Sequence, residues 1–121
     1  SDFKPSKYSD KKIKKDDISN IDLGLKKNKD ILSFVASNFI SAYVVGFAAE
    51  TDNVDTNAKK KLEAKNLDMI VSNDVSDKSI GFDVDDNEVN VYTKNNKFFL
   101  KKDKKIRIAR EVLKIVASNI N

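Results

Sequence analysis

Two apolar runs stand out in a chain that is otherwise rich in charged side chains. The first covers residues 43–49 and stops abruptly at Glu50 and Thr51, and the second covers residues 67–71 and ends in the polar residues 72–74. Continuous apolar runs of this length are typical of strands that are covered on both faces of a sheet. Because ligands bind at the carboxyl ends of strands in open α/β sheets, both run ends are candidate parts of a binding site.

Single residues inside and after these runs carry further predictions. Gly46 would let a neighbouring backbone or a flat ring approach the first strand closely. Thr51 or Asp52 can cap a helix that follows the first run. Asn73 and Asp74, after the second run, fit either a helix cap or a contact with substrate.

Apolar residues at helical spacing predict helices at residues 29–41, at residues 53–65 and from Asp103 to near the end of the chain. Asn28 can cap the first helix, and Asp103 can cap the last. The residues expected to face the core are Ile31, Phe34, Val35 and Phe39, then Val54, Ala58 and Leu62, and finally Ile106, Ala109, Leu113 and Val116, widened by Val112 and Ile115.

The amino-terminal segment differs from the rest of the chain. Residues 1–20 are polar and dense in lysine, which predicts a flap-like loop ahead of an α/β core over residues 21–121. Residues 21–25 alternate apolar and polar side chains, as in a strand with one covered face. We expect a single domain (residues 1–121), and we expect it to be part of a longer polypeptide because the chain begins at Ser1 without an initiator Met.

A hairpin is predicted near the end of the chain. Residues 88–93 and 97–100 can pair across Asn95 and Asn96, which tolerate positive φ, and residues 81–87 form a turn-rich connection ahead of them. The alternation of strands and helices before this hairpin favours right-handed βαβ packing. The pattern therefore predicts an α/β fold.

Composition excludes several classes of chemistry. The 121 residues include no Cys and no His, so disulfides, thiol nucleophiles, thiolate metal sites and the usual zinc ligands and general bases are missing. The net charge of +4 comes from a large excess of Lys over Arg. No apolar run is long enough to span a bilayer and no signal-peptide pattern is present, so we expect a cytoplasmic protein.

Several motifs occur in a characteristic order with compatible spacing. They are Asp2, residues 12–15 (Lys-Ile-Lys-Lys), 27–31, 44–51 (Val-Val-Gly-Phe-Ala-Ala-Glu-Thr), 58–68, 73–76, 81–82 and 86–89. Together they cover nearly the whole chain. In this combination the sequence resembles the carboxyl-terminal half of phosphopantothenoylcysteine synthetase, the phosphopantothenate-cysteine ligase of coenzyme A biosynthesis.

The resemblance implies a Rossmann-like three-layer sandwich with a mostly parallel sheet, plus a carboxyl-terminal hairpin and helix, present here as a partial domain that forms a homodimer. It implies a ligase that activates the carboxylate of 4'-phosphopantothenate with CTP and Mg²⁺, or with ATP as the alternative nucleotide. The acyl-nucleotidylate is then attacked by the amino group of cysteine. FMN would bind only to a fused flavin-dependent decarboxylase domain outside this chain.

The resemblance also assigns roles to individual residues. It places Asp2, Lys12, Lys29, Asp30, Ile31, Leu32, Phe47, Lys61 and Lys65 at the nucleotide, and it gives Lys12 a catalytic role as the flap lysine. A bound triphosphate carries several negative charges, which lysines can neutralise. Lys61 and Lys65 are four residues apart and would share a helix face. Residues 29–32 open a helix, whose free N–H groups suit a polar or anionic ligand.

Two departures from the family's pattern limit these expectations. The family usually has Pro where this chain has Lys29, and a change there should weaken rigidity more than chemistry. The Gly-rich strand-turn-helix of the family's first half is absent from a chain with three Gly, so we expect no complete synthesis from the chain alone.

Plainer alternatives stand beside each of these roles. Lys12 can be one solvated lysine in a charge run, Lys61 and Lys65 an ordinary surface pair, Phe47 a core residue and Asp2 a loop residue. For the chain, the alternatives are a non-catalytic nucleotide-binding or dimerisation fragment and a basic polyanion-binding module. Interleaved aspartates and few aromatics near the lysine cluster disfavour the last, so no nucleic-acid or membrane partner is expected.

Overall fold

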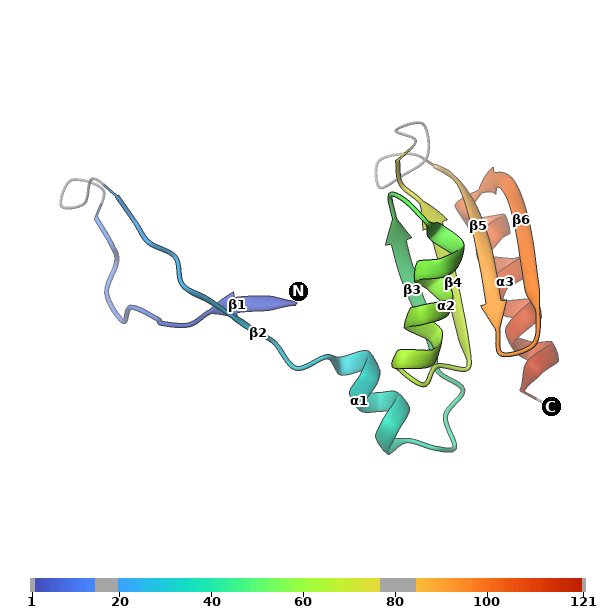
Figure 1. Cartoon of the computed structure of the whole chain (residues 1–121). Coiled ribbons are helices and arrows are strands. Elements are labelled where there is room, and N and C mark those ends of the chain that lie inside the picture. The colour runs from blue at the N-terminus through green and yellow to red at the C-terminus, as the bar shows by residue number, and fades with distance from the viewer. Residues whose placement is uncertain (1, 15–19, 77–84, 121) are drawn as a thin grey trace. The chain divides into compact units, whose positions relative to one another are not determined.

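The computed structural model describes residues 2–14, 20–76 and 85–120, which fall into two compact units (Figure 1). The first unit covers residues 1–31 and the second residues 32–121. The connection predicted at residues 81–87 lies largely outside the described residues, which resume at Asp85.

The first unit contains a short two-stranded ladder. Strand β1 (Phe3–Pro5) pairs antiparallel with β2 (Leu25–Lys27). One further backbone hydrogen bond extends the ladder at each end, from the Ser6 N–H to the Gly24 carbonyl (2.8 Å) and from the Asn28 N–H to the Asp2 carbonyl (2.8 Å).

The expectation of a strand with a covered face over residues 21–25 is wrong. Strand β2 begins only at Leu25, and Ile21 and Leu23 are 65% and 67% exposed. Alternating apolar residues become buried only where a second layer packs on the strand, and within the described part of this unit no helix or second sheet supplies one.

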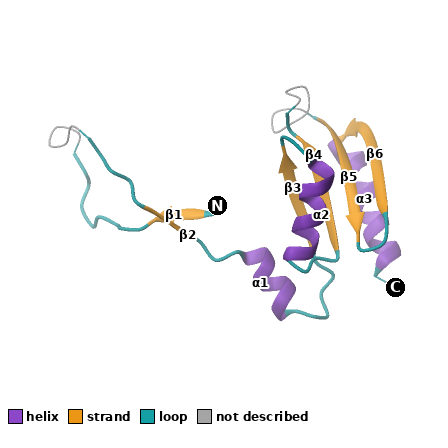
Figure 2. Cartoon of the chain, viewed as in Figure 1, coloured by secondary structure: helices purple, strands orange, loops and turns teal. Residues whose placement is uncertain are grey.

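The second unit is built on a four-stranded sheet with the order β3-β4-β5-β6 (Figure 2). Strands β3 (Val45–Glu50) and β4 (Met69–Asp74) are parallel and pair from Val45 with Met69 to Glu50 with Asp74. The two apolar runs therefore form neighbouring parallel strands, as predicted. The expected cover on both faces is wrong for β3, because Phe47 and Ala49 on its second face are exposed.

The predicted hairpin is confirmed and is longer than expected. Strand β5 (Asp86–Thr93) pairs antiparallel with β4 and with β6 (Lys97–Lys104). The Thr93 N–H donates to the Asn96 carbonyl (2.9 Å), and the Asn96 N–H donates to Thr93 Oγ1 (3.0 Å). The turn closes without positive φ, because the two non-Gly residues with positive φ in the described chain are Asn53 and Asn66.

Helices cover both faces of the sheet, which confirms the three-layer α/β class. Helix α1 (Ile31–Asn38) is shorter than the predicted 29–41, whereas α2 (Val54–Ala64) matches its prediction closely. Helix α2 packs on one face of the sheet and α3 (Lys105–Asn119) on the other (Figure 2). From α1, Leu32, Val35 and Ala36 join the cluster on the α2 face.

Strand side chains divide between two hydrophobic clusters, one on each face, as the period of two requires. The α2-face cluster contains Ala36, Val44, Ala48, Ala58, Leu62, Leu67, Ile70 and Tyr92, flanked by Leu32 and Val35. The α3-face cluster contains Met69, Val71, Val89, Val91, Ile108 and Val112. Gly46 lies where an added Cβ would be 2.7 Å from Leu67 Cδ1 and 3.1 Å from Leu32 Cδ2, so aliphatic side chains, rather than a backbone or a ring, approach it.

The apolar face predicted for the last helix is partly wrong. The buried residues of α3 are Ile108 and Val112, with Ile115 and Val116 partly buried beside them, whereas Ile106 and Leu113 are 62% and 65% exposed. Apolar side chains occur around much of this helix, so the spacing alone does not select the face that packs on the sheet.

The predicted helix caps are also wrong. Asp103 is the penultimate residue of β6, and the N-cap of α3 is Lys104; the Asp103 carboxylate instead accepts the Lys104 N–H (2.7 Å) and pairs with Arg107 (3.6 Å). The N-cap of α2 is Asn53, in a left-handed conformation and without a side-chain cap, rather than Thr51 or Asp52.

Candidate functional site

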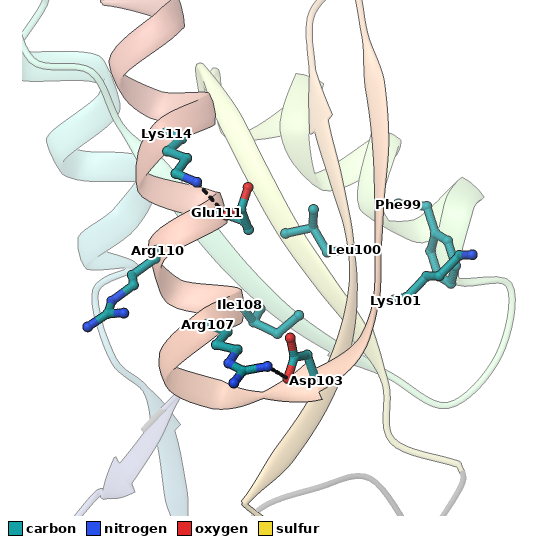
Figure 3. A pocket seen from close by; sticks show the side chains of 9 residues that line it. All are labelled: Phe99, Leu100, Lys101, Asp103, Arg107, Ile108, Arg110, Glu111 and Lys114. Carbon is teal, nitrogen blue, oxygen red and sulfur yellow. Dashed lines mark hydrogen bonds and ion pairs between the residues drawn. The ribbon is translucent and has the colours of Figure 1, made fainter.

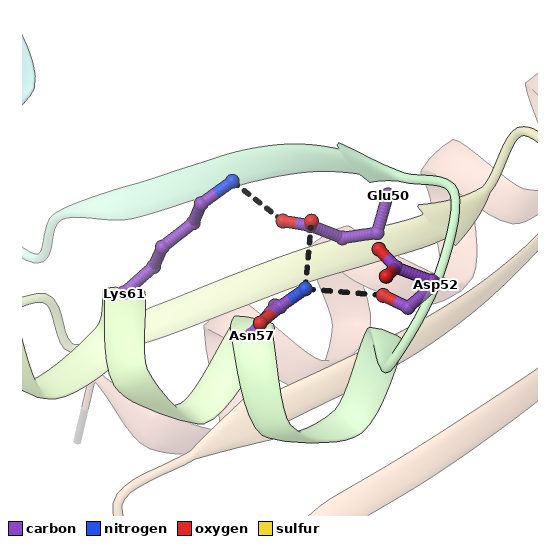
Figure 4. Close-up of polar contacts among 4 residues, drawn as sticks. All are labelled: Glu50, Asp52, Asn57 and Lys61. Carbon is purple, nitrogen blue, oxygen red and sulfur yellow. Dashed lines mark hydrogen bonds and ion pairs between the residues drawn. The ribbon is translucent and has the colours of Figure 1, made fainter.

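A polar cluster lies where β3 ends, on the face that carries α2 (Figure 4). Glu50, the last residue of β3, is only 8% exposed. Its carboxylate accepts from Lys61 Nζ (2.5 Å) and from Asn57 Nδ2 (3.4 Å), and the same amide donates to the Asp52 carbonyl (3.0 Å). Side chains of α2 thus hydrogen-bond both to the end of β3 and to the turn that follows it.

Lys61 comes from the last turn of α2 and extends toward the strand, as Figure 4 shows. Its side chain is 45% exposed, although the ammonium is paired with Glu50. Lys65 follows the helix as its C-cap, four residues later, and is half-buried. The buried stripe of Ala58 and Leu62 lies beside this lysine pair, as predicted.

Phe47 lies on the opposite face of the sheet. It is the third residue of the six in β3, not its carboxyl end, and it is 75% exposed, so the core alternative is wrong. With β4, β5 and α3 it lines a groove of about 320 Å³, whose polar members are Asn73, Asn87 and Lys105. The apolar wall of this groove includes Leu113, one of the residues that α3 leaves exposed.

Alternate residues of β3 point to opposite faces of the sheet, so the strand separates Lys61 and Phe47, which the resemblance assigned to one nucleotide site. Glu50 and its partner Lys61 lie on the α2 face, whereas Phe47 points to the α3 face. A ligand that contacted both Lys61 and Phe47 would have to pass around the outer edge or the carboxyl end of β3.

The other residues assigned to the nucleotide have different surroundings. Leu32 is partly buried against the α2-face cluster. Asp2, Lys12, Lys29, Asp30 and Ile31 belong to the first compact unit and are exposed there. Their grouping with Lys61 and Phe47 stays a prediction.

The polar end of β4 has a local structure of its own. Asp74 accepts hydrogen bonds from the Ser76 N–H (2.9 Å) and hydroxyl (2.5 Å), which form a side-chain turn at the end of the strand. Asn73 lines the Phe47 groove instead. These two residues thus have different surroundings.

A second polar cluster, which the sequence did not indicate, links α2 to the hairpin. The phenol of Tyr92 is buried and donates to Asp55, and Lys97 Nζ donates to the other oxygen of the same carboxylate (2.7 Å). Burial, followed by the hydrogen bond to Asp55, raises the pKa of Tyr92 above its ordinary value. The hydrogen bonds from Lys97 and Tyr92 lower the pKa of Asp55.

A wider pocket of about 440 Å³ lies between β6 and α3 (Figure 3). Its charged groups are largely paired with each other, Arg107 with Asp103 and Lys114 with Glu111 (2.6 Å). Arg110 points away from the hairpin in Figure 3. This arrangement offers few unpaired donors to a ligand, so we place the candidate site at β3 and α2 instead.

Two kinds of feature are missing from the part of the chain that the structure describes. It contains no group of three or more acidic side chains arranged to hold a metal ion. None of its helices combines the length and the apolar character that crossing a membrane requires.

Comparisons with known proteins identify the family of the chain. The profile of the family described as DNA/pantothenate metabolism flavoprotein, C-terminal domain, matches residues 1–120. The coenzyme A biosynthesis bifunctional protein CoaBC of Bacillus subtilis is 40% identical over 118 residues, and that of Haemophilus influenzae is 41% identical over 113 residues. These alignments cover 97% and 93% of this chain but only 29% and 28% of the relatives, so the chain spans less than a third of their length.

Solved structures show the same relationship. A crystal structure of the C-terminal domain of a CoaBC protein superposes with a TM-score of 0.66 at 36% identity, covering 78% of this chain and 46% of that one. A DNA/pantothenate metabolism flavoprotein from Streptococcus pneumoniae, at 22% identity and a TM-score of 0.69, supports the fold alone.

Proposed function

Because the chain belongs to the DNA/pantothenate metabolism flavoprotein C-terminal domain family, we propose that it is the nucleotide-binding half of a phosphopantothenate-cysteine ligase of coenzyme A biosynthesis. The observation that carries the proposal is the contact of Lys61 Nζ with Glu50, which places this ammonium group at the last residue of the parallel strand β3. The carboxyl ends of parallel strands are where open α/β sheets bind their ligands.

The proposed chemistry has two steps. A carboxylate oxygen of 4'-phosphopantothenate attacks the α-phosphorus of CTP and releases pyrophosphate, which leaves an acyl-cytidylate. The amino group of cysteine then attacks the acyl carbon, forms the amide and releases CMP. Negative charge grows on the phosphate oxygens in the first step, and positioned ammonium groups stabilise it.

Within this proposal Lys61 and Lys65 hold the phosphate chain, and the flap residue Lys12 acts on the reacting phosphate. Asp2, residues 29–32 and Phe47 complete the nucleotide site. Mg²⁺ would be carried by the triphosphate oxygens, which is its usual mode of binding to nucleotides. The proposal also includes a homodimer, a cytoplasmic location and FMN confined to a fused decarboxylase domain outside the chain.

Calorimetric titration of the chain with Mg-CTP and with Mg-ATP tests nucleotide binding. We expect saturable binding that favours CTP, weakened about tenfold by Lys61→Ala or Lys65→Ala because each removes a charge-assisted contact to phosphate. Lys60→Ala is the matched control, since Lys60 is an exposed lysine of the same helix.

Two results would count against this function. If the Lys60, Lys61 and Lys65 variants bound Mg-CTP with equal affinity, Lys61 and Lys65 would not belong to the site. Binding of any oligonucleotide with a steep dependence on salt, and without preference for CTP, would favour the polyanion-binding alternative.

A further inference from the structure

Glu50 is the single charged residue in the described part of the chain that is buried. Its side chain is 10% exposed, although an isolated carboxylate at a strand end could point into solvent at little cost. Carboxylates are rarely buried unless they are paired. The position therefore calls for a partner, and the partner is Lys61.

The contact between the two residues leaves Lys61 with unused capacity. One N–H of the ammonium donates to Glu50 at 2.5 Å, whereas an ammonium carries three donors. The lysine side chain is 45% exposed and still reaches solvent, whereas the Glu50 side chain beneath it is 10% exposed. The carboxylate thus restrains the ammonium from below and leaves its other donors accessible.

A second contact restrains the carboxylate itself. Asn57, one helical turn before Lys61, donates to the other oxygen of Glu50 (3.4 Å) and to the Asp52 carbonyl (3.0 Å). The carboxylate is thereby held at both oxygens, and the link extends to the turn that follows β3 (Figure 4).

Resting on the nucleotide-binding role proposed above, we propose that Glu50 is a positioning residue, which holds the Lys61 ammonium beside the end of β3 so that its remaining donors meet a phosphate. A free lysine side chain loses considerable rotamer entropy when it is fixed by a ligand. Because Glu50 fixes it beforehand, less of that loss falls on nucleotide binding.

If Glu50 positions Lys61, its replacement should change nucleotide affinity in the direction opposite to that expected from charge repulsion alone. Replacing a carboxylate near a triphosphate removes a repulsion, so Coulomb interaction alone would tighten binding in Glu50→Gln. Positioning instead requires weaker binding, about fivefold in the dissociation constant of Mg-CTP, since the neutral amide holds the ammonium less strongly. Glu50→Asp keeps the charge but shortens the side chain, and we expect it to weaken binding as well.

The experiment is calorimetry with Mg-CTP on the whole chain and its variants, with a thermal melt of each to show that it is folded. Glu111→Gln is the matched control, because Glu111 also pairs with a lysine but lies on α3. In a Lys61→Gln background, Glu50→Gln should cause no further weakening, since the two residues act as one unit. Unchanged or tighter binding by Glu50→Gln, or a full effect in the Lys61→Gln background, overturns the proposal.

A measurement without nucleotide separates this inference from the proposed function. ¹⁵N relaxation of the lysine ammonium groups should show Lys61 more ordered than Lys60, and the difference should vanish in Glu50→Gln. A Lys61 ammonium as mobile as that of Lys60 overturns the positioning role by itself. An ordered Lys61 in a chain that binds no Mg-CTP overturns the proposed function and, with it, the role of Glu50 toward a phosphate.

Discussion

At the scale of single residues, three polar side chains lie inside the apolar layer on the α2 face. Glu50 is paired with a lysine, and the phenol of Tyr92 donates to Asp55. Ser72 is fully buried, and its hydroxyl has no hydrogen-bond partner among the described residues. Each of these environments leads to a different expectation about stability.

Tyr92 predicts a loss of stability at alkaline pH. Its pKa is raised in the folded state by burial and by the bond to Asp55, so the fold retains a proton that the unfolded chain releases above about pH 10. The free energy of unfolding should therefore decrease as pH rises beyond that value. Urea denaturation between pH 8 and pH 11 measures the slope.

The matched variant for this prediction is Tyr92→Phe, which lacks the titrating group. Its free energy of unfolding should be lower at neutral pH, because Asp55 loses a donor, yet it should fall less steeply above pH 10. The same alkaline slope in both proteins would show that another group is responsible.

Ser72 predicts a gain in stability on truncation. The buried hydroxyl lacks a partner in the described chain, so Ser72→Ala removes a desolvated polar group at the cost of a very small change in volume. We expect the free energy of unfolding to rise by about 1 kcal/mol in urea denaturation. Ser118→Ala, where the exposed hydroxyl donates to the Ile115 carbonyl, is the control and should not stabilise the protein.

At the scale of elements, the carboxyl end of α2 shows how this helix is joined to β4. After the last turn, Asn66 adopts a φ of 52°, and the Leu67 N–H donates to the Leu62 carbonyl (2.9 Å) while the Asn66 N–H donates to Glu63 (3.0 Å). This left-handed ending places Leu67, which is fully buried, at the entrance to β4. The junction thus depends on a residue that accepts positive φ.

Substitution of Asn66 tests this junction. Asn66→Ala should lower the free energy of unfolding by about 1 kcal/mol, because a Cβ without the amide disfavours the left-handed region. Asn66→Gly should be neutral or slightly stabilising. Asn95→Ala, at a turn position without positive φ, should have a smaller effect, and equal losses at Asn66 and Asn95 would contradict the explanation.

At the scale of the whole molecule, the buried core belongs to the second unit. Both hydrophobic clusters are formed by residues from Leu32 onward. In the described part of the chain, β3 has one strand neighbour, β4, so the backbone groups of its other edge pair with no strand there. The superposition on the CoaBC C-terminal domain structure covers 46% of that chain.

Truncation tests where the stability resides. A protein of residues 29–121 should keep its far-UV circular dichroism per residue and melt within a few degrees of the whole chain, because both clusters are retained. A protein of residues 52–121, which lacks β3, should lose cooperative melting, since Val44 and Ala48 leave the α2-face cluster. A large loss of melting temperature in the first truncation would show that the core extends further.

Several features were predictable because they depend on local spacing. The apolar runs of β3 and β4, the extent of α2 and the hairpin follow from short-range patterns, and all are confirmed. The faces of α1 and α3 and the helix caps were predicted wrongly, because several residues offer similar local chemistry there. In the first helix region Ile31, Phe34 and Phe39 are exposed, and of the four residues expected to face the core only Val35 packs against it. The pairing of Glu50 with Lys61 joins residues eleven positions apart on different elements, so no local pattern indicated it.

By itself the sequence determined the order and type of the elements in the second unit, the family resemblance and the absence of Cys and His chemistry, since these depend on residue identity and near-neighbour spacing. Only the tertiary structure decided that Phe47 and Lys61 lie on opposite faces of the sheet and that a buried carboxylate restrains Lys61. The physical reason is that alternate residues of a strand are assigned to a buried or an exposed face only when another element packs on the sheet. In the same way, a charged side chain gains an ion-pair partner only when another element brings one close.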